Sequence, residues 1–209
     1  MLQRRHLLRA ASIFAAAPVF LSVWGGFAAP ARADAAADDA RFIEALGKDL
    51  VAVVNGPGST AEKQAALLKL VDAAVDVEGI ARFCLGRFWR VATPSQQENY
   101  VSLFHRVMQN NITGRLGQYK GVSFTMGRTT PRDGDVGVAT VVTQPGQAPA
   151  DVEWIVATIG GKPQIVDVMA EGTSMRLTQR SDYTSFLSHN NDNVQALIDA
   201  MRKQALAAN

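Results

Sequence analysis

The stretch GVSFTMGRTTPRDGDVGVATVVT, residues 121–143, decides the fold class that the sequence predicts. Val122, Phe124 and Met126 alternate with polar residues, which is the period of a strand with one buried face. The segment PRDGD, residues 131–135, is typical of a turn, and a β-branched run follows it. The stretch therefore predicts two antiparallel strands joined by a short connection.

Two further strands are predicted in the next part of the chain. The segment QPGQAPA, residues 144–150, is typical of a turn, and DVEWIVAT after it places Val152, Trp154 and Val156 on one strand face. A Gly-Gly turn then leads into a fourth apolar run, residues 165–170. Four strands with short connections predict an antiparallel meander.

Helical patterns flank the strands on both sides. Apolar residues recur at three and four positions from Arg41, a capping box begins at Ser59, and Thr93 with Pro94 marks the start of a long helix. Two more helical patterns close the chain. This order predicts an α+β fold, in which helices from both ends of the chain pack on one face of a twisted antiparallel sheet of four to five strands.

The first part of the chain is typical of an export signal. Arg4 and Arg5 precede an Ala-rich apolar run, and Ala31-Arg32-Ala33 fits the small-residue rule for cleavage. We expect residues 1–33 to be a cleaved signal, of the twin-arginine or the general type, and the protein to be periplasmic. Pro18 and a Gly-Gly pair in the run disfavour the alternative of a membrane anchor.

We expect one domain after this signal, over residues 34–209. It is mainly helical over residues 34–121, a sheet over residues 122–171 and helical again over residues 172–209. Removal of the signal takes away four of the 21 basic residues and none of the 19 acidic ones, which leaves 176 residues with a formal net charge of −2. A domain so close to neutral lacks the basic surface of a nucleic-acid-binding protein, so nucleic acid is not an expected partner.

The histidines and the cysteine of this domain form no catalytic or metal-binding pattern. His105 and His189 have no ligand partner at helical or hairpin spacing, so we expect neither a metal nor another cofactor. Cys84 falls on the apolar face of a short helix beside Ile80 and Ala81, and we interpret it as a buried side chain and not a nucleophile. As the only cysteine, it excludes an internal disulfide.

The acidic residues offer no defensible acid–base pair. Asp151 and Glu153 share the polar face of a strand, and Glu171 is expected to form ion pairs with Arg176 and Arg180. The sequence therefore predicts a protein that is not an enzyme. An isomerase or dehydratase on a small α+β cone is the competing hypothesis, and it requires a polar pocket with a perturbed Asp or His.

Three segments form a specific set when they are taken together. They are FCLGRFWRVATPSQQENYVSLF (83–104), IVDVMAEGTSMRLTQRSDYTSFL (165–187) and NVQALIDAMRKQ (193–204). In these marks and their order, over residues 77–205, the chain resembles the MlaC family of periplasmic lipid-binding proteins, also known as toluene-tolerance or ABC-transporter auxiliary proteins. The spellings FCLGR and TQRSDY resemble the hopanoid-associated branch of that family.

The resemblance implies a carrier of lipids. Such a protein holds the acyl chains of a phospholipid, or of a hopanoid-type lipid in the associated branch, in an apolar cavity between sheet and helices. It shuttles the lipid between an outer-membrane lipoprotein–porin complex and an inner-membrane ABC transporter with an MCE-domain subunit. An interaction adaptor with a solid core and no cavity is a further hypothesis.

The sheet and the long helix supply the residues that we expect to line this slot. For each of them the alternative is a side chain that only fills the core, and the second strand is apolar on both faces. The expected lining residues are Val138, Thr140, Val142, Trp154 and Val156 of the sheet, Phe104, Val107, Met108, Ile112 and Leu116 of the helix stripe, and Phe83, Phe88 and Met175, which close the slot.

Overall fold

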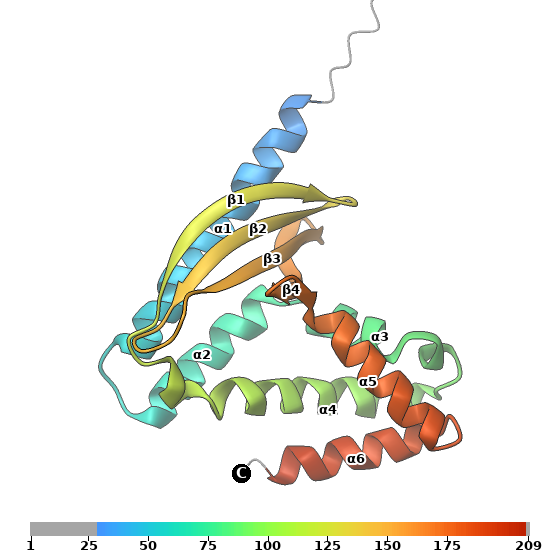
Figure 1. Ribbon diagram of the computed structural model, residues 1–209. Helices are drawn as coiled ribbons and strands as arrows, with labels where there is room; N and C mark the ends of the chain where they lie inside the picture. Colours follow the sequence, from blue (N-terminus) through green and yellow to red (C-terminus); the bar gives the residue numbers. More distant parts are fainter. Residues whose placement is uncertain (1–28, 208–209) are drawn as a thin grey trace, which may run out of the picture.

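The computed structural model describes residues 29–207, as helices arranged around a five-stranded sheet (Figure 1). The expected export signal lies outside these residues except for residues 29–33, which begin α1 (Ala29–Asn55). The helix starts well before Arg41, where the apolar pattern begins, because the intervening residues are mostly alanine, the best helix former. None of the helices within residues 29–207 is long and apolar enough to cross a membrane.

Local capping decides where the next helices begin. Ser59 and Glu62 form a capping box at the start of α2, and Thr93 with Gln96 forms another at the start of α4, where Pro94 takes the first helical position. Both starts are as the sequence predicts. The elements of this half are α2 (Thr60–Ala74), α3 (Val77–Leu85), the 3₁₀ helix η1 (Gly86–Arg90), α4 (Pro94–Thr113) and the 3₁₀ helix η2 (Leu116–Tyr119).

The sheet is an antiparallel meander in the order β1-β2-β3-β4-β5. Asp133 and Gly134 connect the first two strands with φ angles of 44° and 102°, which suit a two-residue hairpin turn. The predicted α+β class and antiparallel sheet are confirmed, and a two-residue fifth strand completes the edge. The strands are β1 (Ser123–Arg132), β2 (Asp135–Thr143), β3 (Ala150–Ile159), β4 (Lys162–Ala170) and β5 (Thr173–Ser174).

The N-terminal helix lies along one face of the sheet (Figure 1). Ile43 of α1 is buried together with Val138 and Val156 of the sheet, and apolar side chains from both elements pack around them. The approach is close at Gly47, where an added Cβ would lie 2.4 Å from the Phe124 ring. A larger residue at position 47 would therefore push α1 away from β1.

The remaining helices form a second core of their own. α5 (Met175–His189) and α6 (Val194–Ala207) pack with α3 and α4 around Tyr100, whose hydroxyl donates a 2.9 Å hydrogen bond to the Ala81 carbonyl. A third, smaller core of Val54, Leu67 and Leu116 joins α1, α2 and η2. Figure 1 shows α2 and α5 leading from the sheet toward the two ends of α4.

Candidate functional site

The inner face of the sheet carries the strand residues that the sequence places together. Val138 pairs with Trp154 across β2 and β3, and Thr140 pairs with Val152 two positions along. Because side chains alternate between faces, the predicted set Val138, Thr140, Val142, Trp154 and Val156 lies on one face, which is the face that α1 covers in part. Val168 of β4 pairs with Trp154 and extends this face.

The polar atoms of Trp154 and Thr140, at the centre of this face, are satisfied within the sheet itself. The indole Nε1 of Trp154 donates a 2.9 Å hydrogen bond to Thr140 Oγ1, and Thr140 Oγ1 donates one of 3.2 Å to the Val152 carbonyl. Thr140 is buried, so its hydroxyl is turned away from water. The centre of the face, around Trp154, therefore presents hydrocarbon and aromatic surface, and its indole N–H has an acceptor within the sheet.

Burial is uneven across the face. Val138 and Val156 are fully buried beneath α1, whereas Val142, Trp154 and Val168 are only half-buried. Complete burial of an apolar side chain of this size normally lowers the free energy of the folded state. These three half-buried side chains therefore form apolar surface that the protein's own helices leave uncovered.

The predicted helix stripe is divided between two cores. Phe104 belongs to the helical core around Tyr100, while Leu116, with Ile112 packed against it, belongs to the small core of α1, α2 and η2. Between them on α4, Val107 is buried and Met108 is half-buried. The structure thus brings these residues into one line along α4 and η2, but not into a single cluster.

The three residues expected to close the slot have different surroundings. Phe88 is buried in the helical core, whereas Phe83 is half-buried and lies beneath the guanidinium groups of Arg176 and Arg180, at 4.6 and 5.0 Å from its ring centroid. Met175, at the first turn of α5, is 52% exposed. An exposed, flexible thioether at a helix start suits a contact with a partner or ligand more than a core position.

Two open pockets lie on the surface of the described residues. A pocket of about 430 Å³ between α1 and α2 is lined mainly by apolar side chains, among them Val53 and Leu70. A pocket of about 530 Å³ is lined by residues of α3, η1 and α5, and four of its side chains are arginines. The first pocket has Asp49 and Lys69 among its lining residues, which form no ion pair with each other, and the second has no acidic lining residue.

The cysteine is unsuited to catalysis. Cys84 is 1% exposed, and burial, with a smaller contribution from Asp167, raises the pKa of its thiol to about 12. Its Sγ lies 3.5 Å from the Arg176 carbonyl oxygen. A thiol with this pKa carries almost no thiolate at neutral pH, and the interpretation of Cys84 as a buried apolar group is consistent with that.

Neither histidine lies in a metal-binding group. His105 Nε2 lies 2.6 Å from Asp72 Oδ1, and His189 Nδ1 lies 2.7 Å from the Ser185 carbonyl oxygen. Within the part of the chain that the structure describes, no three His, Cys, Asp or Glu side chains gather closely enough to hold a metal ion.

Comparison with known proteins connects this geometry to a family. A sequence profile of the family described as MlaC protein matches residues 44–203, which include the whole sheet, α2 to α5 and parts of α1 and α6. The chain belongs to the MlaC family. The resemblance seen in the sequence marks is thereby confirmed.

Two relatives of this MlaC chain illustrate the likeness. The toluene tolerance protein ttg2D of Pseudomonas putida is 24% identical over 136 residues, which are 64% of this chain and 63% of that protein. A solved structure of the phospholipid-binding protein from Ralstonia solanacearum in complex with a phospholipid matches with a TM-score of 0.72 and 18% identity, over 81% of this chain and 98% of that one. The second match shows the shared fold.

One of the family marks in this MlaC chain has a clear structural role. This motif is the segment of residues 165–187, which contains the end of β4 and the start of α5. The buried carboxylate of Asp167 accepts hydrogen bonds from the Ser174 hydroxyl, from the Arg176 backbone N–H at 3.0 Å and from the Val168 backbone N–H. Ser174 in turn caps α5 by accepting from the Leu177 N–H. Asp167 therefore ties the start of α5 to the sheet.

The prediction that Glu171 pairs with Arg176 and Arg180 is wrong. Glu171 Oε1 accepts a 2.9 Å hydrogen bond from the Asp151 backbone N–H, and Arg176 instead forms an ion pair of 3.4 Å with Asp167. Sequence reasoning predicted a polar face for Asp151 and Glu153 and ion pairs for Glu171, but no role for Asp167. The sequence does contain a usable signal, because Asp167 is followed by a turn at Gly172 and by Ser174 directly before a helical pattern.

Proposed function

We propose that this protein is a periplasmic lipid carrier that holds the acyl chains of a phospholipid against the inner face of its sheet. In this proposal it shuttles the lipid between an outer-membrane lipoprotein–porin complex and an inner-membrane ABC transporter with an MCE-domain subunit. Membership of the MlaC family, and a solved relative by fold that is described as phospholipid-binding, support the proposal.

The observation that carries the proposal is the inner face around Trp154. It is mainly apolar, and the polar groups of Trp154 and Thr140 are paired within the sheet. Its half-buried members Val142, Trp154 and Val168 leave apolar surface uncovered. An enzyme site would present free polar groups at such a place, and a solid-cored adaptor would bury these side chains completely.

The roles of the thirteen expected residues follow from their burial. Val142, Trp154, Met108 and Ile112 are half-buried and contact the acyl chains directly. Thr140 positions the indole of Trp154. The buried residues Val138, Val156, Phe88, Phe104, Val107 and Leu116 support the walls from behind, and Phe83 and Met175 lie at the ends of the slot.

The energetics explain why a carrier needs a shelter and no catalyst. Burying one methylene group is worth about 0.8 kcal/mol, so two chains of roughly sixteen carbons cost on the order of 25 kcal/mol to expose to water. A protein that covers these chains removes most of that cost during transit. The half-buried apolar side chains on the sheet supply a surface that can cover acyl chains.

Native mass spectrometry tests the function directly. The protein is purified without detergent, and its mass is recorded before and after incubation with phosphatidylglycerol vesicles. We expect an added mass of one lipid or more, and lipid extraction followed by fragmentation identifies it. The proposal would be overturned if the purified protein contains no lipid and takes up none from vesicles.

The same spectra decide between the two lipid classes. A fragment with a glycerophosphate mass identifies a phospholipid, which the solved relative favours. A pentacyclic hydrocarbon fragment identifies a hopanoid-type lipid, as the spelling FCLGR in the sequence suggests. Either result supports a lipid carrier and names its cargo.

A further inference from the structure

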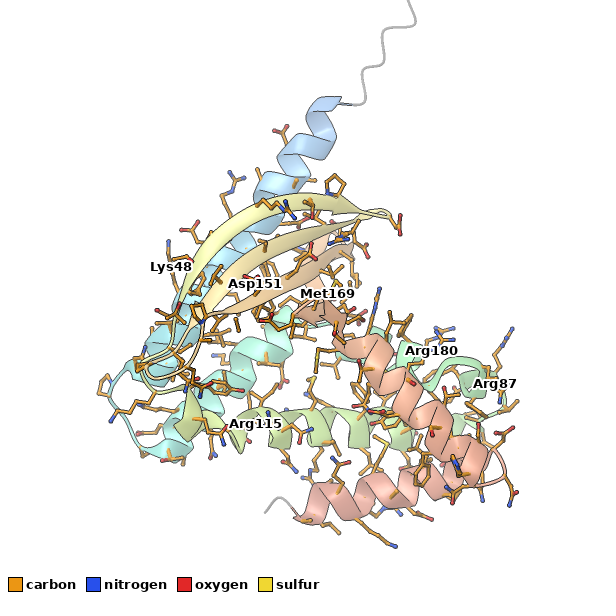
Figure 2. The ribbon with its side chains drawn as sticks, in the orientation of Figure 1. Lys48, Arg87, Arg115, Asp151, Met169 and Arg180 are labelled. Carbon is orange, nitrogen blue, oxygen red and sulfur yellow. The ribbon has the colours of Figure 1, made fainter. Side chains whose placement is uncertain are left out.

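The pocket of about 530 Å³ on the α3–η1–α5 side of the molecule is strongly basic. Its volume lies within the range of ordinary small-molecule sites. Figure 2 shows Arg87 and Arg180 on this side, far from Arg115 at the opposite end of α4. The residues that line the pocket are Gly79, Arg82, Phe83, Gly86, Arg87, Trp89, Arg90 and Arg180.

Three of the four arginines of this pocket form no ion pair with a carboxylate within residues 29–207. No lining residue is acidic, and among residues 29–207 only Arg87 of the four forms an ion pair, with Asp192 at 3.7 Å. Both side chains of that pair are more than half exposed, so the interaction is weak and readily exchanged. Arg82, Arg90 and Arg180 form no ion pair within the same residues, so their charge is available to an anion.

Aromatic rings lie beside three of these guanidinium groups, and the guanidinium carbon of Arg87 lies 4.7 Å from the Phe88 ring centroid. The guanidinium carbon of Arg82 lies 5.5 Å from the Trp89 ring centroid, and that of Arg180 lies 5.0 Å from the Phe83 ring centroid. Stacking of this kind restricts a long side chain while its N–H donors stay free. The three groups are therefore restricted in position before any ligand binds.

Gly86 allows Arg180 to reach its position. Its φ of 59° lies in the left-handed region, and an added Cβ would lie 3.1 Å from Arg180 Nε. A side chain at position 86 would be strained and would press on the guanidinium group. The glycine that ends α3 thus brings the backbone of one element close to the cation of another.

From these features we propose that the pocket is a binding site for a phosphate group, separate from the acyl-chain slot on the sheet. Three guanidinium groups that form no ion pair within the described residues match the charge and the bidentate geometry of phosphate oxygens. The phosphate belongs either to the headgroup of an anionic lipid at a membrane surface or to a free, water-soluble phosphate. Apart from Phe83, the residues of this pocket differ from those of the expected slot. The phosphate site can therefore exist whether or not the slot holds a lipid.

Two binding assays distinguish the sources of the phosphate. In the first, titration calorimetry measures binding of inorganic phosphate and of glycerol 3-phosphate. In the second, cosedimentation compares vesicles of phosphatidylcholine alone with vesicles that contain phosphatidylglycerol. Binding in the first assay identifies a site for free phosphate, and binding to the anionic vesicles alone identifies a headgroup site.

A charge-matched pair of variants locates the site. We expect Arg82→Gln/Arg180→Gln to weaken whichever binding is seen by about tenfold or more. The control Arg115→Gln/Arg128→Gln removes the same charge from exposed positions outside the pocket and is expected to change binding less than about twofold. All four arginines are exposed, so both variants should keep the fold, which thermal melting checks.

Two results would overturn this proposal. One is the absence of binding in both assays at low salt. The other is an equal loss of binding in the pocket variant and the control, which would reduce the effect to overall charge. Neither result bears on acyl-chain binding, which native mass spectrometry measures independently.

Discussion

Trp154 Nε1 donates a 2.9 Å hydrogen bond to Thr140 Oγ1 on the neighbouring strand, and this bond satisfies the indole N–H within the sheet. The bond matters for the proposed function because Trp154 lies on the face that is proposed to hold acyl chains. It holds a large aromatic ring in a fixed orientation while it leaves the surface of the ring apolar. A face of this chemistry can hold hydrocarbon chains of different lengths without a specific polar contact.

Replacing Thr140 by Val tests this bond. The two side chains have nearly the same shape, so the variant leaves the indole N–H without its acceptor. We expect the free energy of unfolding to fall by about 1–2 kcal/mol in urea denaturation. Thr125→Val, at an exposed position on the other face, is the control and is expected to stay within about 0.5 kcal/mol. Equal effects at the two positions would contradict the account of the bond.

Asp167 is expected to be a main determinant of stability at the junction of β4 and α5. Asp167→Ala removes the acceptor of the Ser174 hydroxyl and the Arg176 backbone N–H, and it leaves the half-buried Arg176 side chain unpaired. We expect a loss of about 3–5 kcal/mol in the free energy of unfolding. Ser174→Ala, which removes the helix cap, should cost about 1 kcal/mol. Asp151→Ala, at an exposed carboxylate, is the control, and a similar loss there would contradict this role for Asp167.

The thiol of Cys84 is expected to be inert in the native protein. Its pKa of about 12 leaves roughly one thiolate in ten thousand at pH 8, and the side chain is buried. Dithionitrobenzoate should therefore react fully in guanidinium chloride and not detectably over minutes without it. Fast, stoichiometric labelling of the folded protein would show that Cys84 is accessible and would revive the nucleophile hypothesis.

Asp39 should make stability depend on pH in a defined direction. Burial, followed by the nearby charges of Asp38 and Asp135, raises the pKa of its carboxyl above the ordinary value. The folded state then binds more protons than the unfolded state in the window above the ordinary carboxyl pKa. The free energy of unfolding contributed by this group therefore falls as pH rises through that window and stays lower above it.

Asp39→Asn removes this dependence. The variant should be more stable than the native protein at pH 7, and the difference should shrink as the pH approaches 4. Urea denaturation at several pH values measures it, with Asp49→Asn, exposed on the same helix, as the control. A stability difference that grows in acid would show that the carboxylate of Asp39 is stabilised in the folded state.

The parts of the fold that local chemistry determines could be predicted from the sequence. The caps at Ser59 and Thr93 depend on neighbours three residues away, and the shared face of Val138 and Trp154 follows from strand alternation and short turns. The partners of Asp167 could not be predicted, because they depend on how α5 returns to β4. The candidate slot was predicted as one surface, whereas its residues lie in separate cores because the helices of α3–α6 pack mainly on one another.

The central claim is that the inner face of the sheet holds acyl chains, and two adjacent residues of β2 test it most directly. Val142 is half-buried on the inner face, and Thr143, its exposed neighbour, points to the opposite face. The measurement is the amount of phospholipid per protein after incubation with vesicles, for Val142→Lys and Thr143→Lys, with thermal melting as a check on folding. We predict that Val142→Lys retains less than about a tenth of the lipid bound by the native protein, because burying an ammonium group against acyl chains costs free energy. Thr143→Lys should retain nearly all of the lipid. Equal lipid retention in two folded variants would contradict the account.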